Sequence, residues 1–403
     1  MSEPAAEKHS PRLWLWVLIG AAVLTQTALN LARPVISYKL LALGGDAAVI
    51  GVVTAVYAIL PVVAALWLGR VSDRVQSLRG MVVLGAVLLS VAALLLAAAG
   101  DFLWIGVASA LLGMGHLVFT IAGQSAIARY APLSQLDSGF GWFTAAFSLG
   151  QLIGPLLAGL LLGGGLETTG DARMASVNTA LLLAAGIALA GAPAMLVKSR
   201  TGGRGGQQSG AKALPREGAL AILRTPGVAW NMAASLALLS AIDILVAFLP
   251  LVAEEHGVAP VWVGILLAVR AGASIISRVI LAQLIQRWTR YQLLIASLVG
   301  SGAAIAVAPF FLDALWVAGI ALFVGGFLLG LGQPLTMSLI TQAVSPQSRG
   351  TALAIRLLGN RIGQVVIPLA GGLVAAPLGP AAAIWLVCGL LGLAAVAKST
   401  SKS

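Results

Sequence analysis

The feature of this chain that most constrains its fold is a series of continuously apolar segments, each about 20 residues long, the length at which a helix spans the hydrocarbon core of a bilayer. Only 9% of the 403 residues are charged and the mean hydropathy is +1.00, whereas a soluble domain carries about 25% charged residues. The segments do not alternate apolar with polar residues, as membrane-spanning strands do. The sequence therefore predicts an all-α membrane protein.

Twelve segments meet this description. The expected helices span residues 13–42, 47–69, 80–99, 102–129, 138–163, 174–197, 226–251, 260–285, 290–312, 314–343, 350–375 and 378–397. The first segment is too long for the apolar core of a signal peptide and lacks a small-residue cleavage pattern, so we expect it to stay in the protein. The single cysteine, Cys388, excludes an intrachain disulfide.

Positive charge is distributed unevenly between the two ends of these helices. If both termini lie on one side, nearly all Lys and Arg residues outside the apolar segments fall on that side, and only Lys39 and Arg173 lie at the opposite end. Because cytoplasmic loops are enriched in Lys and Arg, we expect a multi-pass protein of the cytoplasmic (inner) membrane with both termini in the cytoplasm. The net charge of +11 is spread over many loops, so we do not expect nucleic acid as a partner.

One line of sequence is written twice. Residues 149–159 read LGQLIGPLLAG and residues 362–372 read IGQVVIPLAGG, an offset of 213 positions. The same offset pairs Gly51 with Gly264 and Ser125 with Ser338. A shared offset over this length predicts that a six-helix unit occurs twice with the same topology, and transporters with such repeats bind substrate between the two copies.

The stretch KSRTGGRGGQQSGAKALPR, residues 198–216, separates the two copies and is typical of a flexible linker. We therefore expect five parts, namely an N-terminal cytoplasmic tail (1–12), an N-terminal six-helix bundle (13–197), a cytoplasmic linker (198–225), a C-terminal six-helix bundle (226–397) and a C-terminal tail (398–403).

Two motifs make the chain resemble the major facilitator superfamily, and within it the branch of twelve-helix drug/proton antiporters. GRVSDR, residues 69–74, resembles the signature loop of that superfamily, and GxxxxxxxxGxxxGPxxAG, residues 141–159, resembles the antiporter motif. The resemblance covers essentially the whole chain. It departs where Gln76, Ser77 and Leu78 replace a glycine and two basic residues of the loop, and where segment 102–129 has His116 instead of a buried arginine.

The resemblance implies a monomeric secondary active transporter that works by alternating access. Its partners would be a small-molecule substrate, protons and the lipid bilayer, with the proton gradient as energy source and no cofactor. It also implies a cytoplasmic latch, in which Asp73 contacts the start of segment 350–375 and Arg129. The other interpretation of this loop is a solvated turn. The latch residues are Gly69, Asp73, Arg74 and Arg129.

The repeated line has two interpretations of its own. Small residues allow a neighbouring helix to approach closely, whereas proline removes a backbone donor and kinks a helix. Close packing is the simpler interpretation, and paired bends that gate the pathway are the other. The residues concerned in the first copy are Gly150, Gly154, Pro155 and Gly159.

Polar residues inside the apolar segments recur every three or four positions, so each set lies on one face of its helix. Lipid cannot satisfy such faces, which therefore turn toward other helices or a wet cavity. The sets are Gln26, Asn30, Arg33 and Ser37; His116, Thr120 and Gln124; Thr144, Ser148 and Gln151; and Arg356, Asn360 and Gln364. Segments 80–99, 174–197, 290–312 and 378–397 lack such a face, and we expect them to support the others from outside.

Charges within the segments point to a proton and substrate pathway. Asp243 is the one acid inside a segment, and Arg33, Arg270 and Arg361 lie too far from the ends to reach water. Asp243 and Arg270 lie at similar distances from the turn between their segments, which makes them candidate partners. Their pairing is interpreted either as structural or as a switch in which Asp243 takes up and releases a proton.

The excess of arginine over acid suggests an anionic or zwitterionic amphipathic substrate, since guanidinium groups bind such anions. The antiporter motif favours efflux, and proton-coupled import of an organic anion or other small metabolite is the alternative. An enzyme is not expected, because the chain has neither an HExxH metal motif nor a phosphate-binding loop. Metal binding by Glu254, Glu255 and His256 is less favoured than a solvated loop.

Overall fold

The computed structural model describes residues 13–75, 77–131, 136–163, 170–192, 219–345 and 348–400. The expected tail 1–12 and most of the expected linker lie outside these ranges. The helices are α1 (Leu13–Ala42), α2 (Ala47–Arg74), α3 (Arg79–Ala98), α4 (Phe102–Tyr130), α5 (Leu136–Leu162), α6 (Gly170–Ala190), α7 (Ala219–Arg224), α8 (Val228–Glu255), α9 (Pro260–Arg287), α10 (Arg290–Val307), the 3-10 turn η3 (Ala308–Phe311), α11 (Leu315–Ala343), α12 (Arg349–Leu378) and α13 (Ala381–Thr400).

The predicted all-α membrane fold is confirmed. Within the described ranges eleven helices are long and apolar enough to cross a membrane, and α13 contains a shorter apolar stretch, Ala381–Ala397. The short helix α7 lies within the expected linker and was not predicted, because six residues are too few to give a periodic signal. The helices α8 and α12 extend beyond their predicted ends, and Pro250 and Pro377 lie inside them, since neighbouring helices make proline tolerable in such segments.

Polar residues in the connections fix where several helices begin. The side chain of Asp46 accepts from the backbone N–H of Val49 at 2.9 Å, and Asp101 accepts from Trp104 at 2.9 Å. Thr289 and Gln292 form a reciprocal capping box at the start of α10. Each cap satisfies backbone donors that the first turn leaves free. Acidic residues outside the apolar segments thus help to end one helix and start the next.

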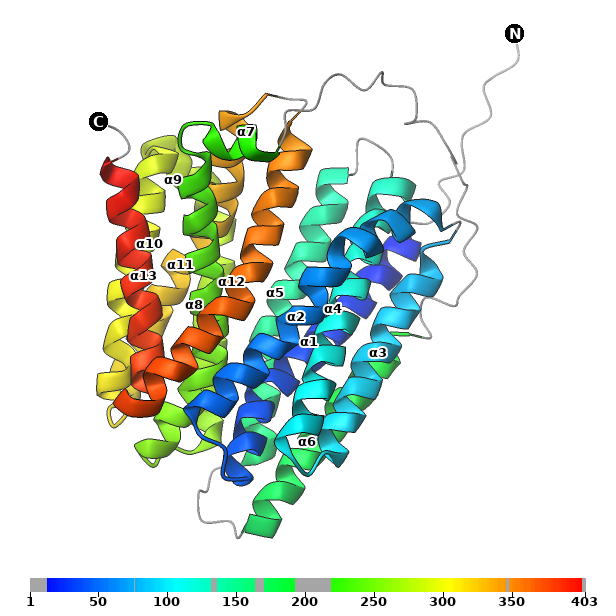
Figure 1. Ribbon diagram of the computed structural model, residues 1–403, viewed down its shortest axis with the longest axis vertical. Coiled ribbons are helices and arrows are strands. Elements are labelled where there is room, and N and C mark those ends of the chain that lie inside the picture. Colours follow the sequence, from blue (N-terminus) through cyan, green and yellow to red (C-terminus); the bar gives the residue numbers. More distant parts are fainter. Residues whose placement is uncertain are drawn as a thin grey trace.

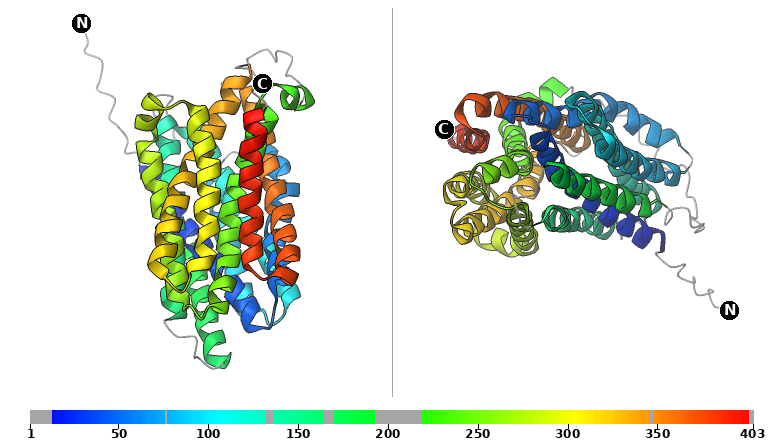
Figure 2. Two further views of the ribbon diagram at one scale, coloured as in Figure 1. Left: turned by 90° about the vertical axis from the view of Figure 1, so that its left-hand side faces the viewer. Right: turned by 90° about the horizontal axis from the view of Figure 1, so that it is seen from below.

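The helices form two groups that lie side by side, α1–α6 and α8–α13 (Figures 1 and 2). Within the first group α3 packs on α6, and within the second α10 packs on α13 at the equivalent place. The main contacts between the groups are those of α2 with α12, α5 with α9 and α1 with α8. The helices expected to give outer support are therefore peripheral, as the sequence predicts.

Two glycine contacts, which we call the seams, join the groups. In the α2–α12 seam, a Cβ atom at Gly51 would meet the carbonyl oxygen of Pro368 and the Cα of Gly372. In the α5–α9 seam, a Cβ atom at Gly264 would meet the carbonyl oxygen of Pro155 and the Cα of Gly159. The offset of 213 turns one set of residues into the other. The line is written twice because each copy packs against a glycine of the other group.

Both seams lie at the end opposite the start of α1 and the end of α13 (Figure 1). Gly51 and Gly264 are near the starts of their helices, and the proline–glycine segments are near the ends of theirs. In Figure 1 the two groups meet at this end and diverge toward the end that carries α7. Among the described residues the close glycine contacts between the two groups thus lie at one end, which we call the closed side.

An ion pair reinforces the same closed side. Arg173, in the first turn of α6, donates to both carboxylate oxygens of Glu254, in the last turn of α8, at 2.8 and 2.5 Å. A bidentate guanidinium–carboxylate pair is strong and directional. Because α6 and α8 belong to different groups, this pair holds the groups together at their outer edge.

Within the first group, the antiporter-like motif packs α5 against α1. Gly150 lies against Gln26, and a Cβ atom at Gly154 would be 2.6 Å from the backbone of Asn30 and of Leu31. In the second copy Ile367 stands where the offset places the equivalent of Gly154. The close-packing interpretation of these glycines is confirmed, and their gating role stays a prediction.

We expect Gly264→Ala to weaken the α5–α9 seam, because the added methyl group overlaps a backbone carbonyl that cannot rotate away. Overpacking of this kind costs about 1–3 kcal/mol, so the melting temperature of the purified protein should fall by a few degrees. The matched control is Gly272→Ala on the same helix, where the nearest atom is the Leu152 side chain at 3.6 Å. Equal melting temperatures for the two variants would contradict this account of the seam.

We expect Arg173→Glu to loosen the closed side and Arg173→Glu with Glu254→Arg to close it again. Spin labels at Asp171 and Glu255, both exposed beside the pair, report the distance between α6 and α8 by double electron–electron resonance in a Cys388→Ser background. The two side chains of the pair are about a quarter exposed, at 23% and 27%, so the pair contributes up to about 1 kcal/mol. Its loss should therefore raise the ratio of the long-distance to the short-distance population severalfold. Unchanged distances in the single variant would show that the pair does not hold the groups.

Candidate functional site

Asp243 lies midway along α8, is 3% exposed, and is held from both groups of helices. Arg33 of α1 donates to its Oδ1 at 2.7 Å, and Gln364 of α12 donates to its Oδ2 at 2.9 Å. A charge in the middle of a membrane requires such partners. The buried carboxylate of Asp243 thus links the two groups directly.

The expected ion pair between Asp243 and Arg270 is absent from the described part of the structure. Similar depth along α8 and α9 is necessary for that pair but does not decide it, since depth says nothing about the direction in which each helix turns its side chains. The carboxylate of Asp243 forms its ion pair with Arg33 instead. The prediction that Asp243 has an arginine partner is correct, and the predicted identity of that arginine is wrong.

The contacts of Arg33 and Gln364 continue in both directions. The Arg33 guanidinium lies 5.3 Å from the ring centroid of Tyr57 on α2, and the Tyr57 hydroxyl is 2.8 Å from Nδ1 of His116 on α4. On the other side Arg361 donates to Gln364 at 2.9 Å. Polar contacts therefore run across five helices at mid-depth.

Tyr57 is a member of this network that sequence reasoning missed. It carries no charge at neutral pH, so a search for intramembrane charge and polar spacing passes over it. The available signal was the repeat, because the offset of 213 places Tyr57 opposite Arg270.

Arg270 is buried to 2% exposure, and its Nε and Nη1 atoms have no hydrogen-bond partner among the described residues. It is near enough to Arg278, Asp243 and Arg33 to interact with their charges. Sequence analysis predicted that Arg270 lies away from the ends of its helix, which the structure confirms, but did not predict that its Nε and Nη1 atoms would lack an acceptor; its role in a pathway stays a prediction.

The arginines nearer the ends of their helices have polar partners instead of extending toward water. Arg278 of α9 donates to the hydroxyl of Ser148 on α5 at 2.7 Å, which crosses between the groups. Arg356 donates to the side-chain oxygen of Gln333 on α11, whose amide donates to the backbone of Ser235 at 2.9 Å. Arg356 therefore ties helices of the second group together.

The remaining predicted polar residues divide between buried and peripheral positions. Gln26, Asn30 and Asn360 are buried, and Gln26 Nε2 and Asn360 Oδ1 have no partner among the described residues. Thr120 donates to its own helix at His116, Gln151 is half-buried, and Gln124 is exposed. The network does not include Thr120, Gln124 or Gln151.

The predicted latch is described only in part. Arg129 donates to the carbonyl oxygens of Ser72 and Val75, each at 2.7 Å, and so fastens the end of α2 to the end of α4. Gly69 accepts from the Ser72 hydroxyl at 2.7 Å, and Arg74 is exposed. The side chain of Asp73 lies outside the described part of the structure, so its contacts with α12 and Arg129 stay a prediction.

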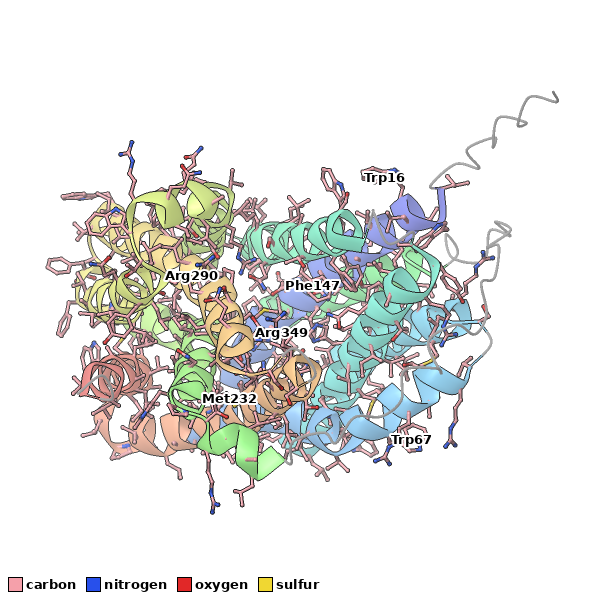
Figure 3. All side chains as sticks on the ribbon, turned by 90° about the horizontal axis from the view of Figure 1, so that it is seen from above. Trp16, Trp67, Phe147, Met232, Arg290 and Arg349 are labelled. Carbon is pink, nitrogen blue, oxygen red and sulfur yellow. The ribbon has the colours of Figure 1, made fainter. Side chains whose placement is uncertain are left out.

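The aromatic residues of α5 have different surroundings. Trp142 is exposed and lies beside Trp16, and Phe143 is buried and stacked on Phe119. Phe147 alone approaches the network, with its ring centroid 6.0 Å from that of His116. In Figure 3 Phe147 lies among the helices of the first group. Packing or lipid contact accounts for Trp142 and Phe143, whereas Phe147 packs against a residue of the network.

A small cavity of about 30 Å³ adjoins Arg33 on the closed side, with room for one or two water molecules. Its polar lining includes Arg33, Ser37, Thr54, Tyr57 and Ser109. It is too small for an organic substrate. Within the described residues no group of three or more His, Cys, Asp or Glu is arranged to hold a metal ion.

Solved transporter structures share this architecture. A bacterial homologue of the human lysosomal transporter Spinster, in an inward-facing and unoccupied conformation, is 17% identical with a TM-score of 0.76 over 97% of both chains. The nucleoside transporter NupG is 14% identical with a TM-score of 0.77, covering 98% of this chain and 100% of its own. A D-xylose–proton symporter is 13% identical with a TM-score of 0.75, covering 96% and 97%. These identities show a common fold only.

A curated relative matches a shorter part of the sequence. The class B tetracycline resistance protein of Escherichia coli is 36% identical over 117 residues, which is 27% of this chain and 27% of the relative. The chain thus matches about a quarter of that protein. Across nearly its full length, in two overlapping matches at residues 18–325 and 263–399, the chain belongs to the Major Facilitator Superfamily.

Proposed function

We propose that this protein is a proton-coupled secondary transporter that exports a small amphipathic compound, anionic or zwitterionic, by alternating access. The observation that carries the proposal is the ion pair of Arg33 with Asp243, which joins the two groups of helices in the middle of the membrane. The partial similarity to a tetracycline resistance protein favours export. The energy source is the proton gradient, and the protein needs no cofactor.

Protonation of Asp243 is the proposed coupling step. The ionised carboxylate holds Arg33 across the interface, and a proton on it removes the charge that makes this contact strong. The small cavity beside Arg33 supports the step, since it gives water a place near the pair. Gain and loss of one proton would thus favour different arrangements of the two groups.

Alternating access would then open the closed side and close the opposite side. With the termini in the cytoplasm, as the distribution of Lys and Arg indicates, the two seams and the Arg173–Glu254 pair face outward in the cytoplasmic membrane. The linker 198–225 would let the bundles 13–197 and 226–397 move relative to each other. In the opposite state the seams part, their prolines supply the bends, and Asp73 closes against the first turn of α12, whose N–H groups favour an anion. The transporter is proposed to work as a monomer.

The charge of the substrate decides between exchange and cotransport. A zwitterion whose positive group needs the Asp243 carboxylate competes with the proton, which is what exchange requires. A simple anion instead gains when the proton neutralises Asp243 and frees Arg33, so anion and proton bind together. This ion pair therefore supports import of an organic anion as the second candidate function.

We expect Asp243→Asn to abolish transport driven by a pH gradient. The measurement is growth of a deletion strain, complemented with each variant, across a panel of toxic compounds and anionic metabolites, followed by flux of the responding compound in proteoliposomes. Glu255→Gln, an exposed acid at the end of the same helix, is the matched control and should behave as the parent protein does.

Removing one partner of a buried pair leaves an unpaired charge and costs about 3–5 kcal/mol, so Asp243→Asn is compared with Arg33→Gln plus Asp243→Asn. The double variant removes both charges and should regain stability without regaining proton coupling. Flux that still follows the imposed pH gradient in the double variant would sink the proposed role of Asp243.

A further inference from the structure

Arg270 differs from the four other arginines that lie in the interior of the membrane-spanning helices, away from their first and last turns. Each of those four donates to a polar side chain, in the pairs Arg33–Asp243, Arg278–Ser148, Arg356–Gln333 and Arg361–Gln364. For Arg270, the described residues supply no acceptor to Nε or Nη1. The nearby carboxylate of Asp243 is already held by Arg33 and Gln364.

Packing fixes Arg270 in this position. Gly326 of α11 lies against the backbone of Arg270, and a Cβ atom there would meet its Cα, carbonyl carbon and carbonyl oxygen. The absence of a side chain at Gly326 therefore lets α9 and α11 come together at this residue. An arginine so placed cannot move its backbone outward to reach water.

An unpaired guanidinium in this setting has a large desolvation cost. Burying an ion without a hydrogen-bond partner costs several kcal/mol even after relaxation. Arg278 and Arg33 add positive charge within electrostatic reach, which the charge of Asp243 offsets only in part. An anion removes both penalties at once, because it accepts the free N–H groups and offsets the local charge. A cation at this point would increase them.

The first group of helices supplies aromatic surface on the other side of Arg33. His116 lies between Tyr57 and Phe147, with ring centroids 6.4 and 6.0 Å away, and it too interacts with the charge of Arg33. Phe147 is only partly buried. Flat apolar rings suit a planar ligand body, whereas the second group presents the unpaired cation.

We propose that Arg270 binds the anionic group of the transported compound, and that this compound is a planar amphiphile, anionic or zwitterionic, with one carboxylate or an equivalent anionic group. The inference rests on the proposed transport function and deepens it by naming the residue and the substrate class. One free guanidinium matches one carboxylate, which can accept two parallel N–H donors. Arg270 is thus a substrate-binding residue, distinct from the Asp243 proton site.

The test uses the purified full chain and three probes of equal size and different charge, namely benzoate, benzamide and benzamidine. Isothermal titration calorimetry measures binding at neutral pH, and the melting temperature gives an independent readout. We expect benzoate to bind and to stabilise the protein, and the neutral and cationic analogues not to do so. No binding of benzoate, or equal binding of benzamidine, would overturn the proposed substrate class.

Variants locate the binding. Arg270→Gln should weaken benzoate binding at least about tenfold, Arg270→Lys should weaken it less because it keeps a point charge, and Arg287→Gln, exposed at the end of the same helix, should leave it unchanged. Without ligand, Arg270→Gln should melt at a higher temperature than the parent, since it removes an unpaired buried charge. Parental affinity for benzoate in Arg270→Gln, or a lower melting temperature, would overturn the assignment.

Asp243→Asn separates this inference from the proposed coupling. The variant should still bind benzoate, since the anion contact does not use the Asp243 carboxylate. Retained binding with loss of gradient-driven flux supports both proposals. Retained binding with unchanged flux leaves the role of Arg270 standing while the coupling role of Asp243 fails, and lost binding shows that Arg270 does not hold the anion independently.

Discussion

The architecture depends on one constraint, which is that lipid supplies no polar or charged partner for a charged side chain. Asp243 and Arg33 come from different groups of helices, and each makes the other tolerable at mid-membrane. The rest of the network extends from this pair, through the Tyr57 ring to His116 and through Gln364 to Arg361. Because the pair lies between the groups rather than within one of them, a single carboxylate joins the two halves of the protein at mid-membrane.

The fold itself was largely readable from the sequence. Long apolar segments and scarce charge are sufficient to predict an all-α membrane protein, since few other structures satisfy their backbone in lipid. The repeat predicted paired units, and the glycines of the repeated line predicted close packing. The partner helices were not predictable, because a glycine indicates that some backbone comes near without identifying which one.

The site was predicted less completely. Polar spacing placed Gln26, Asn30, Asn360 and Gln364 in the buried interior, and mid-membrane charge selected Arg33, Asp243 and Arg270. Their pairing was missed, because the hydrogen bonds depend on helix rotation and tilt, which a single sequence does not record. Lys39 is a further example, since it lies at the opposite end as expected but is buried and donates to Asn178 at 2.9 Å and to the carbonyl oxygen of Ala97 at 2.8 Å.

The reciprocal seams have a mechanical consequence. Each brings two backbones together with no long side chain between them, so it has no flexible group that could keep contact while the backbones draw apart. A seam of this kind is either intact or lost, and because the two seams exchange under the repeat, neither half of the protein is the fixed one.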